Sequence, residues 1–477
     1  MIMTSPASAD VVTSSDKILN LASQEGSLLS VLKDYISEEY DNLRDLSAFL
    51  SARSKSFHLS NVEERQSIAE HPNGAYALIK LFTTDWANVL ERNPAFVNKL
   101  RELKDSLPVR ADYEGAMSAI VRLQRLYRMQ VPDIYSGNYL GYLGPPLGPT
   151  DAFEVGRQAF VDGYLAESIS WLELAADKQR HEALSPQTLA HTLGLLGRAY
   201  FYMNRTEDAR QTYEESLALN PEASDVIQLG VELNVSDTES YGLTSSSWHD
   251  TMSELCQWSQ THRVAKLRSY HVCRYKPSLY LPYVRFQEEI LSTSPYASLF
   301  YNFVSDTEIS QIKNYIRGRM KRGRVGEAED GIISPIRTSD LGWIDDHSLD
   351  DANRISLRIK AATWLEVDQR LPEGPSSSEA FQVVNYGLGG HYDAHIDPFN
   401  PNDSILLSSS GDRIATFLIY LSDVEKGGNT AFIRAGVSVA PQKGMALFWY
   451  NFNPAMKLEK SSFHAGCPVL IGHKWSK

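Results

Sequence analysis

Two short stretches near the C-terminal end carry residue types that bind metals. His395 and Asp397 are two residues apart in a run whose pattern predicts a β-strand, and such residues point to the same face of a strand. An imidazole and a carboxylate on one face make two-thirds of a two-histidine, one-carboxylate triad, which holds Fe(II) and leaves its other positions open. The third ligand must come from elsewhere in the chain, and His464 is the candidate.

A second pair with the same spacing overlaps the first. His391 and Asp393 also lie two apart, on the same predicted strand face as His395 and Asp397. The spacing alone therefore leaves both pairs open as the metal-binding pair. Two glycines directly before His391 favour a bend there, which would place that residue at the edge of the strand.

The chain as a whole has the composition of a globular protein. It has 477 residues, of which 43% are hydrophobic and 22% charged, enough for about three domains of ordinary size. The net charge of −13 argues against a general nucleic-acid or anionic-membrane binder. No apolar run reaches the roughly 18 residues of a membrane span. The first residues lack the charged and apolar regions of a signal peptide, so either one has been removed or the protein is not secreted.

Residues 18–131 are predicted to be mostly helical, and 132–150, rich in glycine and proline, to be a linker. An apolar row with seven-residue spacing runs through the first of these segments at Leu29, Ile36, Leu43 and Leu50. Such a row fits either an ordinary amphipathic helix in a bundle or a seam that pairs two copies of the chain.

Residues 151–225 carry a repeat-like pattern of small and aromatic residues. Tetratricopeptide (TPR) spacing is met at Leu196, Gly197, Tyr200, Ala209, Tyr213 and Pro221, and a looser copy begins near Val155. The pattern predicts paired helices around an aromatic groove, and grooves of this kind bind polyproline II peptides. The candidates for the groove surface are Tyr164, Arg198 and Tyr202.

Residues 251–477 form the last predicted domain. Successive strands separated by turns, without alternating helices, indicate a closed double-stranded β-helix of the jelly-roll type. The predicted fold class is therefore multidomain α + β, with an N-terminal helical region, a TPR-like helical domain and a C-terminal jelly roll.

Five ordered blocks of this domain resemble the 2-oxoglutarate/Fe(II)-dependent dioxygenases, and within them the alpha subunits of collagen-type prolyl 4-hydroxylases. The blocks are FQVVNYGLGGHYDAHID (381–397), GDRIATFLIYLSDV (411–424), GGNTAF (427–432), KGMALFWYN (443–451) and HAGCPVLIGHKW (464–475). The resemblance selects His395 and Asp397 over the overlapping pair and implies His464 as the distal ligand. It also implies that Lys474, Tyr386 and Thr416 hold the distal carboxylate of 2-oxoglutarate, and that Tyr392 is a catalytic residue that orients the substrate.

The resemblance implies that the chain hydroxylates proline to 4-hydroxyproline in collagen-like X-Pro-Gly peptides. Fe(II), O2 and 2-oxoglutarate would be used, succinate and CO2 released, and ascorbate (vitamin C) needed to restore oxidised iron. The three regions would be a dimerisation region (18–131), a peptide-substrate-binding domain (151–225) and a catalytic domain (251–477). The implied partners are a proline-rich peptide, protein disulfide isomerase as a second subunit, and a second copy through the N-terminal helices, with no nucleic acid and no membrane span.

The three cysteines are too few for a disulfide-dense scaffold. Cys256 and Cys273 resemble a pair that is disulfide-bonded in the family, which implies an oxidising compartment, the lumen of the endoplasmic reticulum. Glycosylation sequons, which are used only in the secretory pathway, begin at Asn204, Asn234 and Asn402.

Two alternatives stay open beside this interpretation. One is a related peptidyl-proline hydroxylase that acts on another proline-rich protein. The other is a catalytically dead paralogue that binds polyproline segments, because family members continue past the position of Lys477 and carry the partner of Cys467 in that extension.

Overall fold

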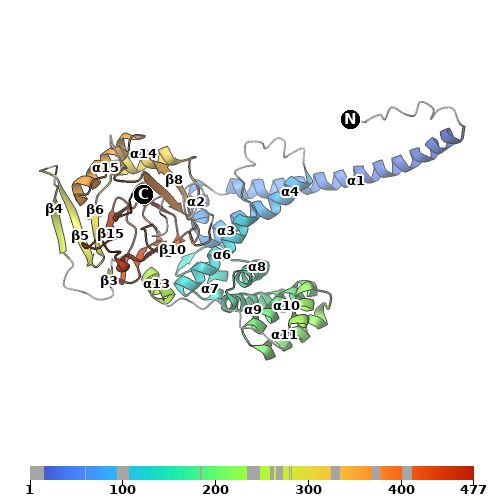
Figure 1. The fold of residues 1–477 in the computed structure, drawn as a ribbon. Coiled ribbons are helices and arrows are strands. Elements are labelled where there is room, and N and C mark those ends of the chain that lie inside the picture. The colour runs from blue at the N-terminus through green and yellow to red at the C-terminus, as the bar shows by residue number, and fades with distance from the viewer. Residues whose placement is uncertain are drawn as a thin grey trace. The chain divides into compact units, whose positions relative to one another are not determined.

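The computed structural model describes residues 15–59, 61–93, 107–182, 185–233, 248–257, 263–264, 272–278, 280, 282–323, 334–367, 376–399 and 411–477. In these ranges the chain is a mixture of helices and antiparallel strands (Figure 1). Its contacts form two compact units, one made of residues 1–65 and 87–99 and the other of residues 66–86 and 100–477. Residues 66–86 and 100–131 thus belong to the larger unit.

The smaller unit is built around one long helix. α1 (Ser15–Leu59) is accompanied by α4 (Ala87–Arg92) and by the start of α2 (Val62–Glu70), and Asn42 Nδ2 on α1 donates to Asn93 Oδ1 at 3.1 Å. The apolar row at Leu29, Ile36, Leu43 and Leu50 lies on α1 with exposed fractions of 46% to 65%. Within the described part of this unit, the row is therefore not buried.

The larger unit begins with a helical part. Its helices and one small hairpin are α3 (Pro72–Leu81), the π-helix η1 (Phe82–Trp86), α6 (Arg110–Tyr127), α7 (Val131–Tyr135), β1 (Asn138–Tyr139), β2 (Tyr142–Leu143), α8 (Pro149–Val161), α9 (Leu165–His181), α10 (Pro186–Tyr202), α11 (Thr206–Leu219), α12 (Ser224–Leu233) and α13 (Trp248–Gln257). No helix in the described ranges is long and apolar enough to cross a membrane.

The segment predicted to be a linker, 132–150, is folded into the core. Ile134 and Tyr139 are fully buried. The side chain of Asn73 donates to the carbonyls of Ile134 and Pro145, both at 2.9 Å, and accepts the hydroxyl of Tyr139 at 2.8 Å. Glycine and proline here shape a compact hairpin, so the composition alone was misleading.

Two glycines of the repeat-like pattern lie where helices cross. A Cβ on Gly156 of α8 would come within 2.9 Å of Leu172 on α9, and a Cβ on Gly197 of α10 within 2.4 Å of Leu229 on α12. The absent side chains thus allow a close approach of the helices.

The C-terminal part of the larger unit consists mostly of strands. Their bounds are β3 (Arg263–Val264), β4 (Val272–Pro277), β5 (Arg285–Thr293), β6 (Tyr296–Tyr301), β7 (Lys321–Arg322), β8 (Asp340–Ile344), β9 (Phe381–Tyr386), β10 (Tyr392–His395), β11 (Ala415–Ile419), β12 (Lys426–Gly427), β13 (Thr430–Phe432), β14 (Val437–Val439), β15 (Ala446–Tyr450), β16 (His464–Gly466), β17 (Val469–Ile471) and β18 (Lys474–Ser476). The helices among them are α14 (Asp306–Ile316), α15 (Asp350–Thr363) and the 3-10 turn η3 (Lys460–Ser462).

Two five-stranded sheets form the centre of this part. Their strand orders are β10-β16-β13-β14-β3 and β11-β15-β6-β5-β4, and a four-stranded sheet β18-β9-β8-β7 and the pair β12-β17 accompany them. Along β15, Leu447 and Trp449 pack with Phe432 and Val437 of the first sheet, whereas Phe448 packs with α14 and α15. The alternation of the strand thus places one core between the sheets and a second under the helices.

Helices α6 and α13 share a core with β13, β16 and β17. Their buried residues share one core with Ala431, Ala465 and Leu470, and Tyr127 of α6 donates its hydroxyl to the carbonyl of Pro468 at 2.6 Å. The helical part and the strand part are therefore joined by a common apolar core.

The predicted disulfide between Cys256 and Cys273 is wrong. Cys256 is bonded to Cys467, and Cys273 is a free, exposed thiol. Cys256 lies on α13, which packs against β13 and β14, whereas Cys273 lies on β4, the outer strand of the other sheet. Cys256 and Cys273 are thus close in sequence but lie in different parts of the fold. The sulfur bonded to Cys256 is that of Cys467, which directly follows β16.

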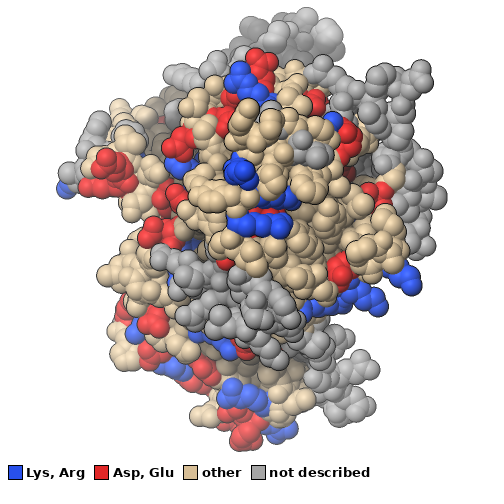
Figure 2. Space-filling model, turned by 90° about the vertical axis from the view of Figure 1, so that its left-hand side faces the viewer, with Lys and Arg blue, Asp and Glu red and all other residues tan. Residues whose placement is uncertain are grey.

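On the face shown in Figure 2, basic and acidic side chains are scattered in small groups among other residues. Of the three sequons, Asn204 is exposed after α10, while Asn234 and Asn402 lie outside the described residues.

The disulfide pairing can be checked by alkylation. In the native protein, iodoacetamide should label Cys273 at once, whereas Cys256 and Cys467 should be labelled only after reduction and unfolding, because both are buried. Replacing Cys256 by serine should lower the free energy of unfolding by about 2–5 kcal/mol, while Cys273→Ser should leave it nearly unchanged. Recovery of a Cys256–Cys273 peptide by non-reducing mass spectrometry would contradict this pairing.

Candidate functional site

Three candidate metal ligands meet at the pairing of β10 with β16. His395 and His464 are direct partners across these antiparallel strands, and Asp397 follows β10. Asp397 Oδ1 lies 3.4 Å from His395 Nε2 and 3.7 Å from His464 Nε2. All three ligand atoms fall within 4.8 Å of one another. This is the donor set of two imidazoles and one carboxylate that holds Fe(II) with open positions.

Both histidines have a fixed tautomer. His395 Nδ1 is 2.7 Å from the carbonyl oxygen of Asp393, and His464 Nδ1 is 2.8 Å from that of Ser462. A carbonyl can only accept, so each Nδ1 carries the hydrogen and each Nε2 keeps a lone pair directed toward Asp397. Such bonds hold imidazoles in place for a metal. Burial also lowers the pKa of His464 to about 4, so this ring is uncharged at neutral pH.

The carboxylate of Asp397 is held by a second layer of polar groups. Thr416 Oγ1 donates to Asp397 Oδ2, and Asn451 Nδ2 donates to Thr416 Oγ1 at 3.0 Å. Burial by itself raises the pKa of Asp397, but the nearby His464 and His395 and the Thr416 hydrogen bond outweigh it and hold the pKa well below its ordinary value. Thr416, predicted to bind a cosubstrate carboxylate, thus has its hydroxyl hydrogen directed to the metal ligand. Asn451 was not identified as a site residue from the sequence. The one indication was its position directly after the apolar run 446–450, which forms the buried strand β15.

The overlapping pair is placed differently. His391 is 2% exposed. Its Nδ1 is 2.7 Å from Thr338 Oγ1, and its Nε2 is 3.3 Å from Asp393 Oδ1. Burial lowers the pKa of His391 to about 4. Among the residues that the structure describes, no third ligand joins this pair, and its polar atoms are engaged in holding the chain before β10.

Lys474 is a buried cation in the same part of the fold. It lies on β18 directly opposite Tyr386 on β9 and is only 3% exposed. Its Nζ donates to the carbonyl of Gly428 at 2.7 Å and lies 5.6 Å and 5.5 Å from the ring centres of Tyr386 and Tyr420. No carboxylate within the described ranges forms an ion pair with it. Burial lowers the pKa of Lys474 to about 7, so an anionic ligand would relieve the cost of burying its charge.

Tyr392 lies beside the metal ligands. Its ring stacks on that of His395 with 3.7 Å between centres, and the guanidinium carbon of Arg337 lies 4.8 Å from the Tyr392 ring centre. Arg337 is 7% exposed and donates to Gln382 at 2.6 Å, while its buried Nε has no hydrogen-bond partner in the described part of the chain. Sequence reasoning did not single out Arg337, and nothing in its spacing set it apart.

The three predicted peptide-binding residues fall at two places. Arg198 and Tyr202 meet at Glu232, to which Arg198 Nη2 and the Tyr202 hydroxyl each donate at 3.0 Å. Tyr164, in contrast, lies under Arg125, with 3.9 Å from the guanidinium carbon to the ring centre. The structure therefore joins two of the three residues through an acidic side chain that the sequence did not reveal.

The choice between the two overlapping pairs can be tested with matched substitutions. Asp397→Asn should weaken Mn(II) binding, used here as a redox-stable substitute for Fe(II), by more than about 100-fold, because a first ligand is lost. Asp393→Asn makes the same chemical change four residues earlier in the chain and should leave the affinity nearly unaltered. Electron paramagnetic resonance of free Mn(II) measures both, and the opposite ranking would assign the site to His391 and Asp393.

Comparisons with known proteins agree along most of the chain. Residues 14–141 match the profile of the prolyl 4-hydroxylase alpha-subunit N-terminal region, and residues 381–477 match that of the 2OG-Fe(II) oxygenase superfamily. Prolyl 4-hydroxylase subunit alpha-3 of Homo sapiens is 30% identical over 98% of this chain and 91% of its own length. Subunit alpha-1 of Gallus gallus is 28% identical over 98% and 95%. The crystal structure of a viral collagen prolyl hydroxylase from Paramecium bursaria Chlorella virus-1 covers 38% of this chain and 92% of its own, at 24% identity and a TM-score of 0.29.

Proposed function

Because the chain belongs to the family of prolyl 4-hydroxylase alpha subunits, we propose that it is a 2-oxoglutarate-dependent dioxygenase that converts proline to 4-hydroxyproline in collagen-like X-Pro-Gly peptides. Bound Fe(II) and 2-oxoglutarate together supply the activation of O2, with succinate and CO2 as the products of the cosubstrate. The observation that carries the proposal is the meeting of His395, Asp397 and His464 in a fold that also buries Lys474 without an acidic partner in the described residues.

The residues of the chain have separate tasks in this reaction. His395 and His464 present the Nε2 lone pairs and Asp397 its carboxylate to the metal. Thr416 and Asn451 keep Asp397 ionised and oriented. We assign Lys474 and Tyr386 to the distal carboxylate of 2-oxoglutarate, since they are cross-strand neighbours at a buried position, and Tyr392 to the orientation of the substrate beside His395. The strands around these residues we assign to a double-stranded β-helix.

We assign the paired helices α8 to α12 to a TPR-like peptide-binding domain. Arg198 and Tyr202 share Glu232, and the ring centres of Phe160 and Tyr202 lie 6.0 Å apart. Aromatic rings near polar groups are suited to a polyproline II chain, which has a preformed shape and exposed carbonyls. Tyr164, which directly precedes α9 and lies under Arg125, would contact the peptide at a second place.

We also propose the assembly and the location by analogy with the family. The exposed apolar row on α1 is suited to self-association, and protein disulfide isomerase is the expected second subunit. A buried disulfide and an exposed sequon at Asn204 are compatible with a glycoprotein of the endoplasmic reticulum lumen. Ascorbate is the expected reductant for iron oxidised in unproductive cycles.

Binding of 2-oxoglutarate should depend on pH through Lys474. In the free protein this amine is charged below its pKa of about 7, so above that value binding of the anion must take up a proton, and the Kd should rise about tenfold per pH unit. The pKa values of Tyr386 and Tyr420 are raised by burial, so neither ring titrates near neutral pH. Calorimetric titration of the Mn(II)-loaded chain from pH 6 to 9 measures the slope. Lys474→Arg stays charged and should bind weakly without a slope; a constant wild-type Kd would contradict the role of Lys474.

The activity itself is tested by succinate release. With Fe(II), ascorbate, protein disulfide isomerase and a Pro-Pro-Gly repeat peptide, release should depend on the peptide, and the peptide should gain the mass of one oxygen atom per proline modified. His395→Ala should abolish both signals while peptide binding persists, since His395 lies on β10 and the proposed peptide groove is formed by helices α8 to α12. Succinate release by the wild type that does not depend on the peptide, without a mass gain, would contradict hydroxylation of this peptide.

A further inference from the structure

A chain of hydrogen bonds leads from Lys474 to helix α6 of the helical part. Lys474 Nζ donates to the carbonyl of Gly428 at 2.7 Å, and the Gly428 amide donates to the carbonyl of Pro468 at 3.0 Å. The same Pro468 carbonyl accepts the hydroxyl of Tyr127 at 2.6 Å. Tyr127 is only 2% exposed, so water does not compete for this bond.

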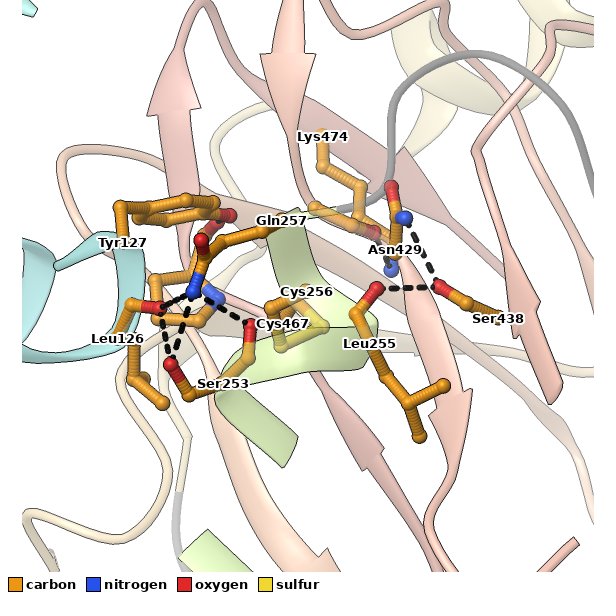
Figure 3. The surroundings of a disulfide bond; sticks show 12 residues. Leu126, Tyr127, Ser253, Leu255, Cys256, Gln257, Asn429, Ser438, Cys467 and Lys474 are labelled. Atoms are coloured by element: carbon orange, nitrogen blue, oxygen red, sulfur yellow. Dashed lines mark hydrogen bonds between the residues drawn. A yellow bond between two sulfur atoms is a disulfide. The ribbon is translucent and has the colours of Figure 1, made fainter. Parts of the chain in front are cut away.

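The contacts from Lys474 through Gly428 and Pro468 to Tyr127 form a first arm. A second arm leads from the same turn, residues 427–429, to helix α13. The carbonyl of Asn429 accepts the amide of Cys467 at 2.8 Å, and its side chain donates to Ser438 Oγ at 2.9 Å. Ser438 in turn donates to the carbonyl of Leu255 at 2.7 Å. The disulfide between Cys467 and Cys256, the residue after Leu255, closes this arm, as Figure 3 shows.

The turn between the two arms has little stiffness of its own. Gly427 and Gly428 both have left-handed backbone, with φ of 84° and 71°, which glycine adopts readily and does not enforce. A Cβ on Gly427 would lie 2.5 Å from the Tyr127 hydroxyl oxygen, so this hydroxyl occupies the space that the missing side chain leaves. The position of the turn is therefore set by its neighbours.

We propose that Tyr127 and the Cys256–Cys467 disulfide are positioning groups for the cosubstrate: they fix the Gly428 carbonyl that directs the ammonium of Lys474. A lysine ammonium has three donors on a flexible stem. One donor held by a fixed carbonyl leaves the other two aimed at a defined point, where the distal carboxylate binds. The inference rests on the proposed function, and it makes α6 and α13 part of the 2-oxoglutarate site although they precede the strands in sequence.

Tyr127→Phe tests the first arm, because it removes one hydroxyl and keeps the buried ring. In the full chain loaded with Mn(II), the Kd for 2-oxoglutarate by calorimetry should rise about three- to tenfold, the loss of one buried hydrogen bond, while the Mn(II) affinity stays constant. In turnover, the KM for 2-oxoglutarate should rise with kcat at saturation nearly unchanged. Tyr139→Phe is the matched control, since it removes an equally buried hydroxyl bonded to Asn73 and should leave the Kd at the wild-type value.

The double substitution Cys256→Ser and Cys467→Ser tests the second arm and should raise the Kd in the same direction. If that variant does not fold, Tyr127→Phe decides alone. A wild-type Kd in Tyr127→Phe, or an equal rise in Tyr139→Phe, overturns the inference and leaves the proposed function intact. Failure of the Mn(II)-loaded wild type to bind 2-oxoglutarate overturns the proposed function and the inference with it.

Discussion

The antiparallel pairing of β10 with β16 is the constraint on which the site depends. It sets His395 directly opposite His464, and both rings are turned by the same device, a bond from Nδ1 to the carbonyl two residues earlier. A slip of one residue in this register would turn one imidazole to the other face of the sheet. The two candidate histidine ligands are therefore placed by backbone geometry on paired strands. The third candidate, Asp397, follows β10 and is held by the hydrogen bonds of Thr416 and Asn451.

The buried ammonium of Lys474 is the second physical feature on which the candidate site depends. Lys474 lies 3% exposed between two tyrosine rings with one carbonyl partner, and its pKa is lowered by that burial. Such a group is costly in the free protein, and an anion that enters its position recovers part of the cost. Burial lowers the pKa of the free lysine. The same low-dielectric surroundings strengthen the electrostatic attraction between the charged ammonium and a bound dicarboxylate.

The helical part also supports the strands that carry the candidate site. Residues 66–86 and 107–175 share a core with the strands around Ala431, Ala465 and Leu470, and the disulfide fastens α13 to the segment after His464. Helices that precede the strands in sequence, such as α6 and α13, thus support β13, β16 and β17. This shared core explains why these helices belong to the same compact unit as the strands.

Local patterns in the sequence identified the candidate residues for the chemistry. A two-residue spacing on a strand brings His395 and Asp397 to one face, the family blocks select them with His464 and Lys474, and the glycines at 156 and 197 mark helix crossings. The tertiary structure decided what depends on contacts between distant segments. It pairs Cys256 with Cys467 rather than Cys273, folds 132–150 into the core, and turns the Thr416 hydroxyl toward Asp397. Periodicity reports which face a residue lies on, because that is set by the residue's own helix or strand, whereas the partner across that face is set only when the elements pack.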